Sequence, residues 1–382
     1  MSVKLELDVV TPSIKNESGG VGAVVKDLYS SYVDLYPKDN CRLLTIDEGL
    51  EKCDVSKIDT RISMHTFERN LMKSIGFSLG LLHEANNCDA DLIHTHGMWM
   101  AVSLYQNIAN RKKNIPFVIS PHGMLDPWIL NRSRFKKLVA KIFYENYSKK
   151  YCARYHALNA AEADSILKYN KNAKVEVIPN GVNIDYSYKP VISAYQEKDV
   201  FQLLYLGRIH SKKNVESLIL SLLAVTKSEY EKKPFLLNIV GWGHSSDIQR
   251  INELIEQAPE RFCFHGPKFG REKNELYIKS DALVLPSFSE GLPMVVLEAW
   301  SFGLPVLMSK HCNLSYAFKD NCAFEVSTDT YKLRSDISRF MKLTSLERYS
   351  LALNAFNNVR SKYQWSVIAE DMKQLYLDVL ND

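Results

Sequence analysis

Short apolar runs alternate along the chain with longer stretches in which apolar residues recur at helical spacing. The runs are rich in β-branched and aromatic residues and stop at Gly, Pro or Ser, which is typical of strands buried on both faces of a parallel sheet. Stretches such as VGAVVKDLYSSYVDLY and VESLILSLLAVTKSEY show the helical pattern. The alternation predicts an α/β protein with parallel sheets. The runs lie in LELDVVTP, ADLIHTHG, PFVISPHG, ARYHALN, KVEVIPNG, FQLLYLGR, FLLNIVGW, FCFHGP, ALVLPS and PVLMS.

The length of 382 residues suits two domains of roughly 150 to 200 residues each. A polar stretch follows VIPNG and precedes FQLLYLGR, so we place the boundary there. We expect an N-terminal domain at 1–185, a C-terminal domain at 200–362 and an amphipathic helix at 363–382. Open α/β sheets bind ligands beyond the carboxyl ends of their strands, which is where candidate site residues are sought.

Composition excludes several classes of protein. With 46% apolar and 24% charged residues, the chain is a folded globular protein and not a disordered, collagen-like or coiled-coil one. A net charge of +4 is too small to indicate a nucleic-acid partner. The seven cysteines are scattered without a C-x-x-C pair, which indicates reduced thiols. Neither a signal peptide nor an apolar run of about 20 residues is present, so we expect a cytoplasmic protein.

Two carboxylates flank a predicted helix start in DALVLPSFSEGLPMVVLEAWSFGLPVL. A helix N-terminus offers free amides and partial positive charge to an anion, while Glu290 and Glu298 can accept hydrogen bonds from sugar hydroxyls. This combination suits a nucleotide sugar. The alternative is that Glu290 only caps the helix, through the spacing Ser287-x-x-Glu290, and that Glu298 lies on a solvated face.

The segment resembles the retaining glycosyltransferases of family 4, whose Glu-x7-Glu signature is matched by Glu290 and Glu298. The resemblance implies a GT-B fold: two Rossmann-like domains with parallel sheets that face each other across a cleft, and a last helix that crosses back to the first domain. It places Glu290 on the donor sugar and Glu298 on the ribose hydroxyls. The residues between them that it also assigns to donor binding are Gly291, Leu292, Pro293 and Met294.

A second motif, LLYLGRIHSKKNVESLI, predicts a strand, a turn at Gly207 and a helix after Asn214. Arg208 and Lys213 could then grip a pyrophosphate and offset the charge that grows on a leaving diphosphate. The family motif usually reads G-R-x(4)-K-G, and Asn214 stands where it has the second glycine. Asn tolerates the left-handed conformation better than most residues, so the departure is mild. The alternative is two surface cations at a helix start.

Two glycine clusters complete the predicted donor site. Gly19, Gly20 and Gly22 precede a helix in SGGVGAVVKDL, where they would let the backbone approach a ligand. They lack the GK[ST] ending of an ATP-binding P-loop and the full G-x-G-x-x-G spacing of an NAD-binding loop. The resemblance puts this loop beside the donor phosphates and the acceptor, and puts Gly241 and Gly243 of GWGHSS beside the base or phosphates.

Two strand ends in the first domain carry histidines, in DLIHTHGMW and VISPHGMLDPW. We expect His96 and His122 where strands break into loops. A lone histidine there is more often structural than catalytic, but the resemblance places His122 next to the reacting sugar. His96 and Asp126 are assigned to acceptor binding. In HALNAAEADSI, Asn159 replaces the Ser-rich turn common in the family, which leaves the role of that loop open.

No metal and no cofactor is expected besides the nucleoside-diphosphate sugar that serves as donor substrate. The sequence gives no converging set of three or four ligands. Asp89, Ala90 and Asp91 match the metal-binding D-x-D motif. They precede a predicted strand, whereas the motif follows one, so we interpret them as a polar loop.

Cations gather in residues 132–154, NRSRFKKLVAKIFYENYSKKYCAR, with apolar residues at helical spacing among them. One interpretation is a helix lying on an anionic membrane surface, the cytoplasmic leaflet, to which each cation adds about 1 kcal/mol. The other is that the apolar stripe is ordinary core and the charges face solvent.

The sequence therefore predicts a retaining glycosyltransferase that moves a sugar to a saccharide acceptor, a lipid-linked one by analogy, in synthesis of a cell-surface polysaccharide such as O-antigen, capsule or exopolysaccharide. Its catalytic residues are expected to be His122, Glu290, Arg208 and Lys213. The alternatives are a GT-B nucleotide-sugar epimerase and a non-catalytic nucleotide-sugar-binding protein.

Overall fold

The computed structural model describes residues 4–15, 20–47, 50, 55, 58–70, 75–126, 130 and 134–382, with only the backbone of residues 134 and 135. Its contacts divide the chain into two compact units. Unit 1 comprises residues 1–181 and 365–382, and unit 2 comprises residues 182–364. The last helix therefore belongs to the first unit, as the fold prediction has it.

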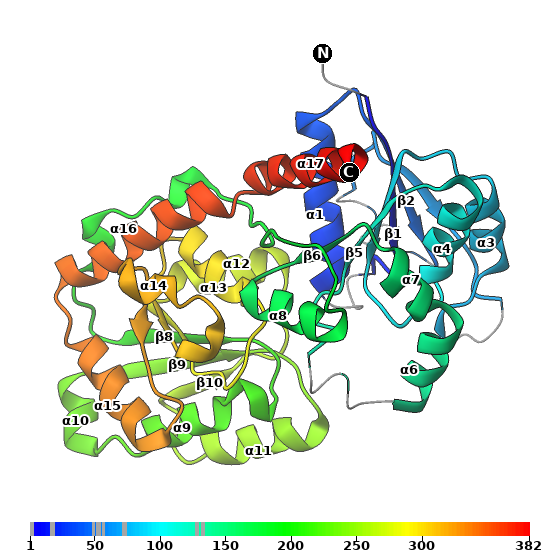
Figure 1. The fold of residues 1–382 in the computed structure, drawn as a ribbon. Coiled ribbons are helices and arrows are strands. Elements are labelled where there is room, and N and C mark those ends of the chain that lie inside the picture. Colours follow the sequence, from blue (N-terminus) through cyan, green and yellow to red (C-terminus); the bar gives the residue numbers. More distant parts are fainter. Residues whose placement is uncertain are drawn as a thin grey trace. The chain divides into compact units, whose positions relative to one another are not determined.

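Unit 1 is built on a seven-stranded parallel sheet of order β3-β2-β1-β4-β5-β6-β7 (Figure 1). Its chain order is β1 Glu6–Thr11, α1 Gly20–Leu35, β2 Asn40–Thr45, β3 Ser63–Thr66, α3 Leu79–Asn86, β4 Leu92–His96, α4 Ser103–Lys113, β5 Phe117–Ser120, α6 Arg134–Ala140, the π-helix η3 Lys141–Glu145, α7 Asn146–Tyr151, β6 Arg154–Ala157, α8 Ala160–Tyr169, β7 Val175–Val177 and α17 Trp365–Asn381.

Unit 2 has a six-stranded parallel sheet of order β10-β9-β8-β11-β12-β13. Its elements are the 3-10 turns η4 Tyr186–Tyr188 and η5 Ile192–Tyr195, β8 Phe201–Leu206, η6 Ser211–Lys213, α9 Val215–Leu223, α10 Lys227–Lys232, β9 Phe235–Val240, α11 Ser245–Ile255, β10 Phe262–Phe264, α12 Gly270–Lys279, β11 Ala282–Leu285, α13 Met294–Ser301, β12 Val306–Met308, η7 Lys310–Cys312, α14 Tyr316–Lys319, β13 Phe324–Glu325, α15 Thr330–Met341 and α16 Ser345–Lys362.

Every strand predicted from an apolar run forms, but three further strands carry no such signal. β2 pairs with β1 along its whole length, although Asn40 and Arg42 interrupt its apolar pattern. β3 and β13 are short edge strands with few buried positions. The predicted helix 215–230 is two helices, because the chain turns after Leu223 and Thr226 caps α10 with a capping box.

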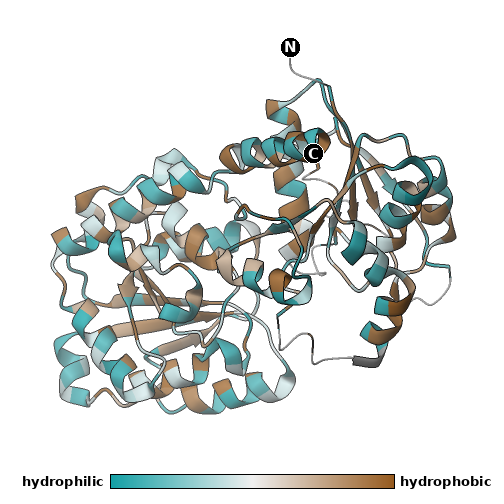
Figure 2. Cartoon of the chain, viewed as in Figure 1, coloured by the Kyte–Doolittle hydropathy of each residue, from teal (hydrophilic) through white to brown (hydrophobic). Residues whose placement is uncertain are grey.

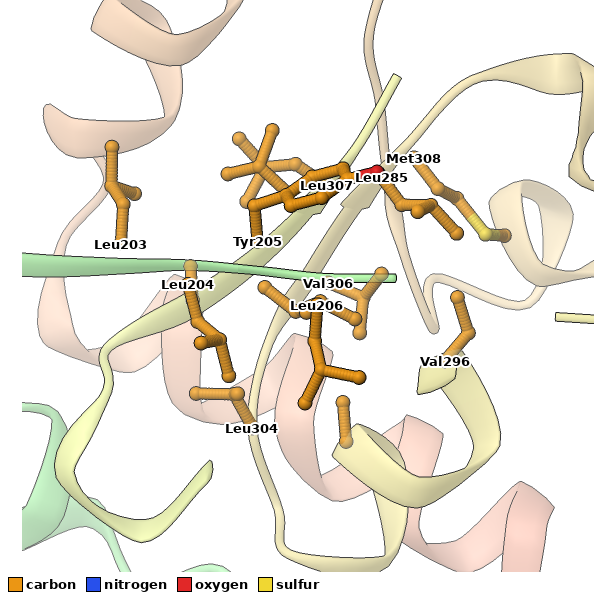
Figure 3. Close-up of a cluster of buried hydrophobic side chains, with 14 of the residues drawn as sticks. Leu203, Leu204, Tyr205, Leu206, Leu285, Val296, Leu304, Val306, Leu307 and Met308 are labelled. Atoms are coloured by element: carbon orange, nitrogen blue, oxygen red, sulfur yellow. The ribbon is translucent and has the colours of Figure 1, made fainter. Parts of the chain in front are cut away.

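The central strands of unit 2 fix the loops that follow them. Leu203, Tyr205, Leu285 and Leu307 are fully buried and belong to one apolar cluster, which Figure 3 shows with Val296 of α13. Because these strands are parallel and sequence-distant motifs follow β8, β9 and β11, the motifs meet at one edge of the sheet.

Helix α17 completes the core of unit 1. Ile368, Met372 and Tyr376 are buried in the same cluster as Leu28 and Tyr32 of α1. The buried ammonium group of Lys373 lies 2.6 Å from the carboxylate of Asp39. The helix is therefore an integral layer of unit 1.

Candidate active site

Glu290 lies in the loop after β11 and pairs with Lys213. The Lys213 ammonium group lies 2.6 and 2.5 Å from the two carboxylate oxygens, and the Ser287 hydroxyl donates to the same carboxylate at 2.6 Å. Helix α13 begins at Met294 after Pro293 and has no side-chain cap. The alternative that Glu290 caps this helix is therefore wrong.

Hydrogen bonds to the segment that follows β12 hold this loop in place. The Glu290 N–H donates to the carbonyl of His311 at 3.1 Å, and Asn313 donates to the carbonyls of Glu290 and Gly291 at 2.5 and 3.3 Å. Leu292 and Met294 pack against the core of unit 2. The Val296 N–H donates to the carbonyl of Pro293 at 2.9 Å, which leaves the amides of Met294 and Val295 at the start of α13 available to an anion.

Glu298 lies on α13 and has two protein partners. Lys273 of α12 lies 2.7 Å from one carboxylate oxygen, and the hydroxyl of Tyr277 donates to the other at 2.7 Å. Burial, and then the Glu298 charge, raise the pKa of Tyr277 far above its ordinary value, so its hydroxyl stays a donor. The alternative of a merely solvated carboxylate is wrong, and the assignment of Glu298 to the ribose stays a prediction.

The motif after β8 folds as predicted, including its unusual residue. Asn214 adopts the left-handed conformation with φ 58°, so it supplies the backbone geometry of the glycine it replaces. Its buried side chain also donates to the carbonyls of Pro286 and Thr328, at 3.1 and 2.9 Å. Asn214 thereby ties this turn to the end of β11, and this brings Lys213 to Glu290.

Arg208 lies exposed at the end of β8. Its carbonyl accepts a hydrogen bond from Tyr205 at 3.0 Å, while its guanidinium group forms no ion pair within the described part of the chain. Of the two predicted diphosphate cations, Lys213 is therefore held by a carboxylate and Arg208 is not.

The glycines after β8 and β9 are required by close packing of two loops. A Cβ at Gly241 would lie 1.8 Å from the carbonyl oxygen of Gly207, and one at Gly243 would lie 2.4 Å from that of Ile209. These contacts explain both glycines without a ligand. Their assignment to donor binding stays a prediction.

In unit 1, His122 follows β5 in a turn of two left-handed residues. Its φ is 51° and that of Gly123 is 76°. The N–H of Gly123 donates to the buried carboxylate of Glu162 at 2.6 Å, and Asn159 caps the start of α8 by accepting from the Glu162 N–H. The loop that departs from the family pattern at Asn159 thus positions the turn that carries His122. Asp126 lies just after this turn and its N–H donates to Gly123.

Three buried histidines lie behind this turn and are joined to His122 in one hydrogen-bonded network through the hydroxyls of Ser120 and Tyr29. His94, His96 and His156 are buried, and His96 Nδ1 lies 2.9 Å from His122 Nε2. His96 is the last residue of β4, so it lies where the strand breaks into a loop, as predicted, but its side chain is buried behind His122. The assignment of His96 to acceptor binding stays a prediction. Burial lowers the pKa of His122 to about 3 and that of His156 to about 4, and it lowers those of His94 and His96 well below the ordinary value, so all four rings are neutral.

Of the predicted glycine-rich loop, Gly19 lies outside the described residues, whereas Gly20 and Gly22 belong to the first turn of α1 and do not precede the helix. A Cβ at Gly22 would lie 3.0 Å from the Cα of Ile14, whereas Gly20 has no atom within 4 Å of such a Cβ. Gly22 thus lets α1 pack on the preceding loop, and Gly20 has no comparable packing reason.

The cation-rich segment 132–154 exposes apolar side chains. Leu138, Ile142 and Phe143 are 54%, 64% and 72% exposed, so the interpretation of this stripe as ordinary core is wrong. Figure 2 shows hydrophobic residues on α6. Arg154, in contrast, pairs with Asp382 at 2.9 Å and does not belong to this surface. Arg132 lies outside the described residues. Within the described part of the chain, no helix has the length and apolar character needed to cross a membrane.

Residues 139–145 are anchored by Glu145 at the end of η3. Its buried carboxylate accepts from the Trp99 N–H at 2.8 Å and from the Ser103 hydroxyl at 3.2 Å. Burial raises the pKa of Glu145 to about 7.

The described residues contain no group of three His, Cys, Asp or Glu side chains that could hold a metal ion. Asp89 accepts a hydrogen bond from Lys113, and Asp91 accepts one from the N–H of Glu6.

Sequence reasoning missed several residues around the two sites. They are Tyr29, Ser120, His156 and Tyr376 behind His122, Glu162 beneath its turn, Ser287 on Glu290, and Lys273 and Tyr277 on Glu298. The sequence contained one signal for Glu162, because Asn159-x-x-Glu162 matches the capping pattern at the start of a helix.

Comparisons with known proteins agree with this architecture. Residues 18–186 match the family model described as Glycosyltransferase Family 4, and residues 192–355 match the one described as Glycosyl transferases group 1. The chain is 24% identical over 310 residues to the UDP-Gal:alpha-D-GlcNAc-diphosphoundecaprenol alpha-1,3-galactosyltransferase of Escherichia coli, covering 76% of each chain.

A second relative is the lipopolysaccharide 1,2-N-acetylglucosaminetransferase of Salmonella typhimurium, 25% identical over 292 residues that cover 72% of this chain and 70% of the relative. Among solved structures, Anabaena HepE in complex with UDP aligns with a TM-score of 0.76 at 16% identity, over 98% of this chain and 100% of that chain. The predicted fold class is confirmed. The chain is therefore a GT-B glycosyltransferase whose two halves belong to Glycosyltransferase Family 4 and to Glycosyl transferases group 1.

Proposed function

We propose that the protein transfers a sugar, with retention of configuration, from a nucleoside-diphosphate sugar to a saccharide acceptor during synthesis of a cell-surface polysaccharide. The observation that carries the proposal is the charged group at the carboxyl edge of the unit 2 sheet. There Glu290 is held by Lys213 and Ser287, next to the helix N-terminus of α13. Arg208 adds a cation at the end of β8.

These groups match the three chemical parts of such a donor. Arg208, Lys213 and the first amides of α13 suit the diphosphate, because cations and helix N-termini stabilise anions. Glu290 suits the sugar hydroxyls and Glu298 suits those of the ribose. The name of the E. coli relative specifies UDP-Gal, and the HepE structure contains UDP, which supports a nucleoside-diphosphate donor. The reaction needs no further cofactor.

Donor binding would exchange one partner of Lys213. A diphosphate competes with Glu290 for the ammonium group, and the released carboxylate can then accept from the sugar. In the transfer, the acceptor oxygen attacks the anomeric carbon on the face from which the diphosphate departs. Its proton passes to the departing phosphate oxygen, whose charge Arg208 and Lys213 stabilise. His122 would lie beside the reacting sugar.

We further propose that the acceptor is lipid-linked and that unit 1 contacts the cytoplasmic membrane leaflet. Leu138, Ile142 and Phe143 are exposed together with Lys136 and Lys141. Apolar side chains among cations are what an amphipathic helix offers to anionic lipids. The name of the E. coli relative specifies an undecaprenol-linked acceptor, which supports this part of the proposal.

The direct test is nucleoside-diphosphate release by the purified protein from GDP-, UDP- and dTDP-sugars, with and without lipid-linked acceptor. We expect acceptor-dependent release from one donor, with large losses in Glu290→Gln and Arg208→Ala. Arg271→Ala, which removes an exposed arginine of α12 that pairs with Glu275 of the same helix, should keep wild-type activity. Isomerised donor without release would instead identify an epimerase, and binding without turnover a non-catalytic protein.

The membrane contact has its own test. Vesicles containing anionic phospholipid should bind the wild-type protein, and Phe143→Glu should weaken that binding. Tyr331→Glu places the same charge on a strongly exposed aromatic position of unit 2 and should leave it unchanged. Equal vesicle binding by wild type and Phe143→Glu would refute the contact.

A further inference from the structure

A chain of hydrogen bonds in unit 1 ends on a backbone carbonyl. Because a carbonyl can only accept, it determines which group donates in each hydrogen bond from there to His94. His156 Nε2 lies 2.7 Å from the carbonyl oxygen of Ile178, which can only accept, so Nε2 carries the proton. Because His156 is neutral, its Nδ1 accepts from the Ser120 hydroxyl at 2.6 Å. That hydroxyl has one proton, so its oxygen accepts from His94 Nε2 at 2.6 Å. His94 Nδ1 is therefore an acceptor.

The chain continues through two tyrosine hydroxyls to His122. The Tyr376 hydroxyl lies 2.7 Å from His94 Nδ1, and the Tyr29 hydroxyl lies 2.9 Å from each of His94 Nδ1, the Tyr376 hydroxyl and His96 Nε2. His96 Nδ1 lies 2.9 Å from His122 Nε2. The chain thus joins residues of α1, β4, β5 and β6 to α17 and to the turn that carries His122.

Two proton arrangements are open at the tyrosine pair, and they differ by one hydrogen bond. If His96 carries its proton on Nε2, then His96 donates to Tyr29, Tyr29 to Tyr376, and Tyr376 to His94. If it carries the proton on Nδ1, Tyr29 must donate to His96, and the single proton of Tyr376 can then serve either His94 Nδ1 or Tyr29, so one of these two hydrogen bonds is lost. One net hydrogen bond favours the first arrangement about fivefold.

We propose that this chain holds His122 in the Nε2–H tautomer, leaving its Nδ1 unprotonated as a hydrogen-bond acceptor, and that Tyr29 is the positioning residue that sets this tautomer. In the favoured arrangement His96 Nδ1 accepts, so His122 Nε2 must donate. Among the described residues, none bonds Nδ1 of His122, and the His122 side chain is partly exposed. Nδ1 is then free to accept from a sugar hydroxyl, a role that rests on the proposed function.

Comparing Tyr29→Phe with Tyr376→Phe distinguishes a change in the His122 tautomer from a general disturbance of the core. Without the Tyr29 hydroxyl, a proton on His96 Nε2 would be buried with no acceptor, so it moves to Nδ1 and the proton of His122 moves to its own Nδ1. Without the Tyr376 hydroxyl, Tyr29 still reaches His94 at 2.9 Å and still accepts from His96. The two variants lose the same atom from neighbouring tyrosines and should give opposite results.

The measurement is the ring-nitrogen NMR signature of His122 in protein labelled with ¹⁵N-histidine, assigned by its loss in His122→Gln. We expect the Nε2–H pattern in wild type and in Tyr376→Phe, and a shift toward the Nδ1–H pattern in Tyr29→Phe. Tyr32→Phe removes another buried hydroxyl of α1, bonded to Asp39 and outside the chain, and should keep the wild-type pattern. Unfolding midpoints confirm that each variant is folded.

The inference fails if wild-type His122 carries its proton on Nδ1, or if folded Tyr29→Phe keeps the Nε2–H pattern. Should Tyr29→Phe not fold, Ser120→Ala tests the same chain, since it detaches His94 from the fixed carbonyl and should reduce the wild-type preference. The NMR result needs no substrate, so it stands apart from the transferase assay. If the function is also as proposed, Tyr29→Phe should lower kcat/KM about fivefold or more, and Tyr376→Phe less.

Discussion

The ion pair between Lys213 and Glu290 gives a quantitative test of how the site is held before a donor binds. The Glu290 side chain is only 7% exposed, and it has the Lys213 ammonium group and the Ser287 hydroxyl as partners. Lys213→Met keeps the length of the side chain and removes its charge. Breaking a fully buried pair costs about 3–5 kcal/mol. Because the Lys213 side chain is 28% exposed and water can reach the carboxylate after the change, we expect a loss of about 2 kcal/mol.

The double-mutant cycle isolates the pair itself. Glu290→Gln leaves Lys213 free to turn toward water, so it should destabilise unit 2 by only about 1 kcal/mol. Lys213→Met with Glu290→Gln should then lose less than the two single changes together, with a coupling of about 1–2 kcal/mol. Lys227 forms an exposed pair with Glu231 on α10, so the unfolding free energy of Lys227→Met should stay within about 0.5 kcal/mol of the wild-type value.

The two units need not unfold together, so the free energy of unfolding must be measured for unit 2 by itself. Native-state hydrogen exchange of the β8 and β11 amides, at increasing urea concentrations, supplies it. If Lys213→Met is as stable as the wild type and the coupling is below about 0.3 kcal/mol, the pair does not hold the site and the reasoning is refuted.

Three further outcomes are expected. Gly241→Ala would place a Cβ 1.8 Å from a backbone oxygen and should destabilise unit 2 by about 3 kcal/mol, whereas Gly20→Ala, with open space around it, should leave the melting temperature unchanged or slightly raised. Lys373→Met would leave Asp39 buried without its cation and should cost about 3–5 kcal/mol in unit 1, seen as a lower thermal unfolding midpoint. The raised pKa of Glu145, about 7, means that the folded state binds its proton more tightly than the unfolded state. Stability should therefore fall by about 3 kcal/mol from pH 4.5 to 7, and Glu145→Gln should remove that fall.

The sequence predicted what local pattern determines. Apart from β2, β3 and β13, the strands of both sheets followed from apolar runs, and the left-handed Asn214 followed from the tolerance of asparagine for that conformation. Glu290 and Glu298 were found because their spacing is a family signature. Such signals lie within a few residues of each other, so one sequence is enough to reveal them.

The missed residues depend on contacts between distant segments. Tyr29 and Tyr376 are 347 positions apart, and each has the pattern of an ordinary apolar residue on a helix. Their hydroxyls matter only because α17 returns to α1, a contact that helical periodicity cannot specify. The same holds for β2 and β3, which are strands because β1 offers β2 a partner and β2 offers one to β3, and not because of their own apolar content.

The return of the last helix to unit 1 has a consequence for protein engineering. Val182 and Gln364 form an isolated bridge, and the Val182 N–H donates to the carbonyl of Tyr363 at 2.6 Å, so unit 2 begins and ends at neighbouring points. It is a continuous insert, and a cassette exchange between related enzymes should be cut at these two positions. A hybrid joined at the first position alone would receive its final helix from the other parent, and its unit 1 would then depend on a foreign layer at the place where Tyr376 meets Tyr29.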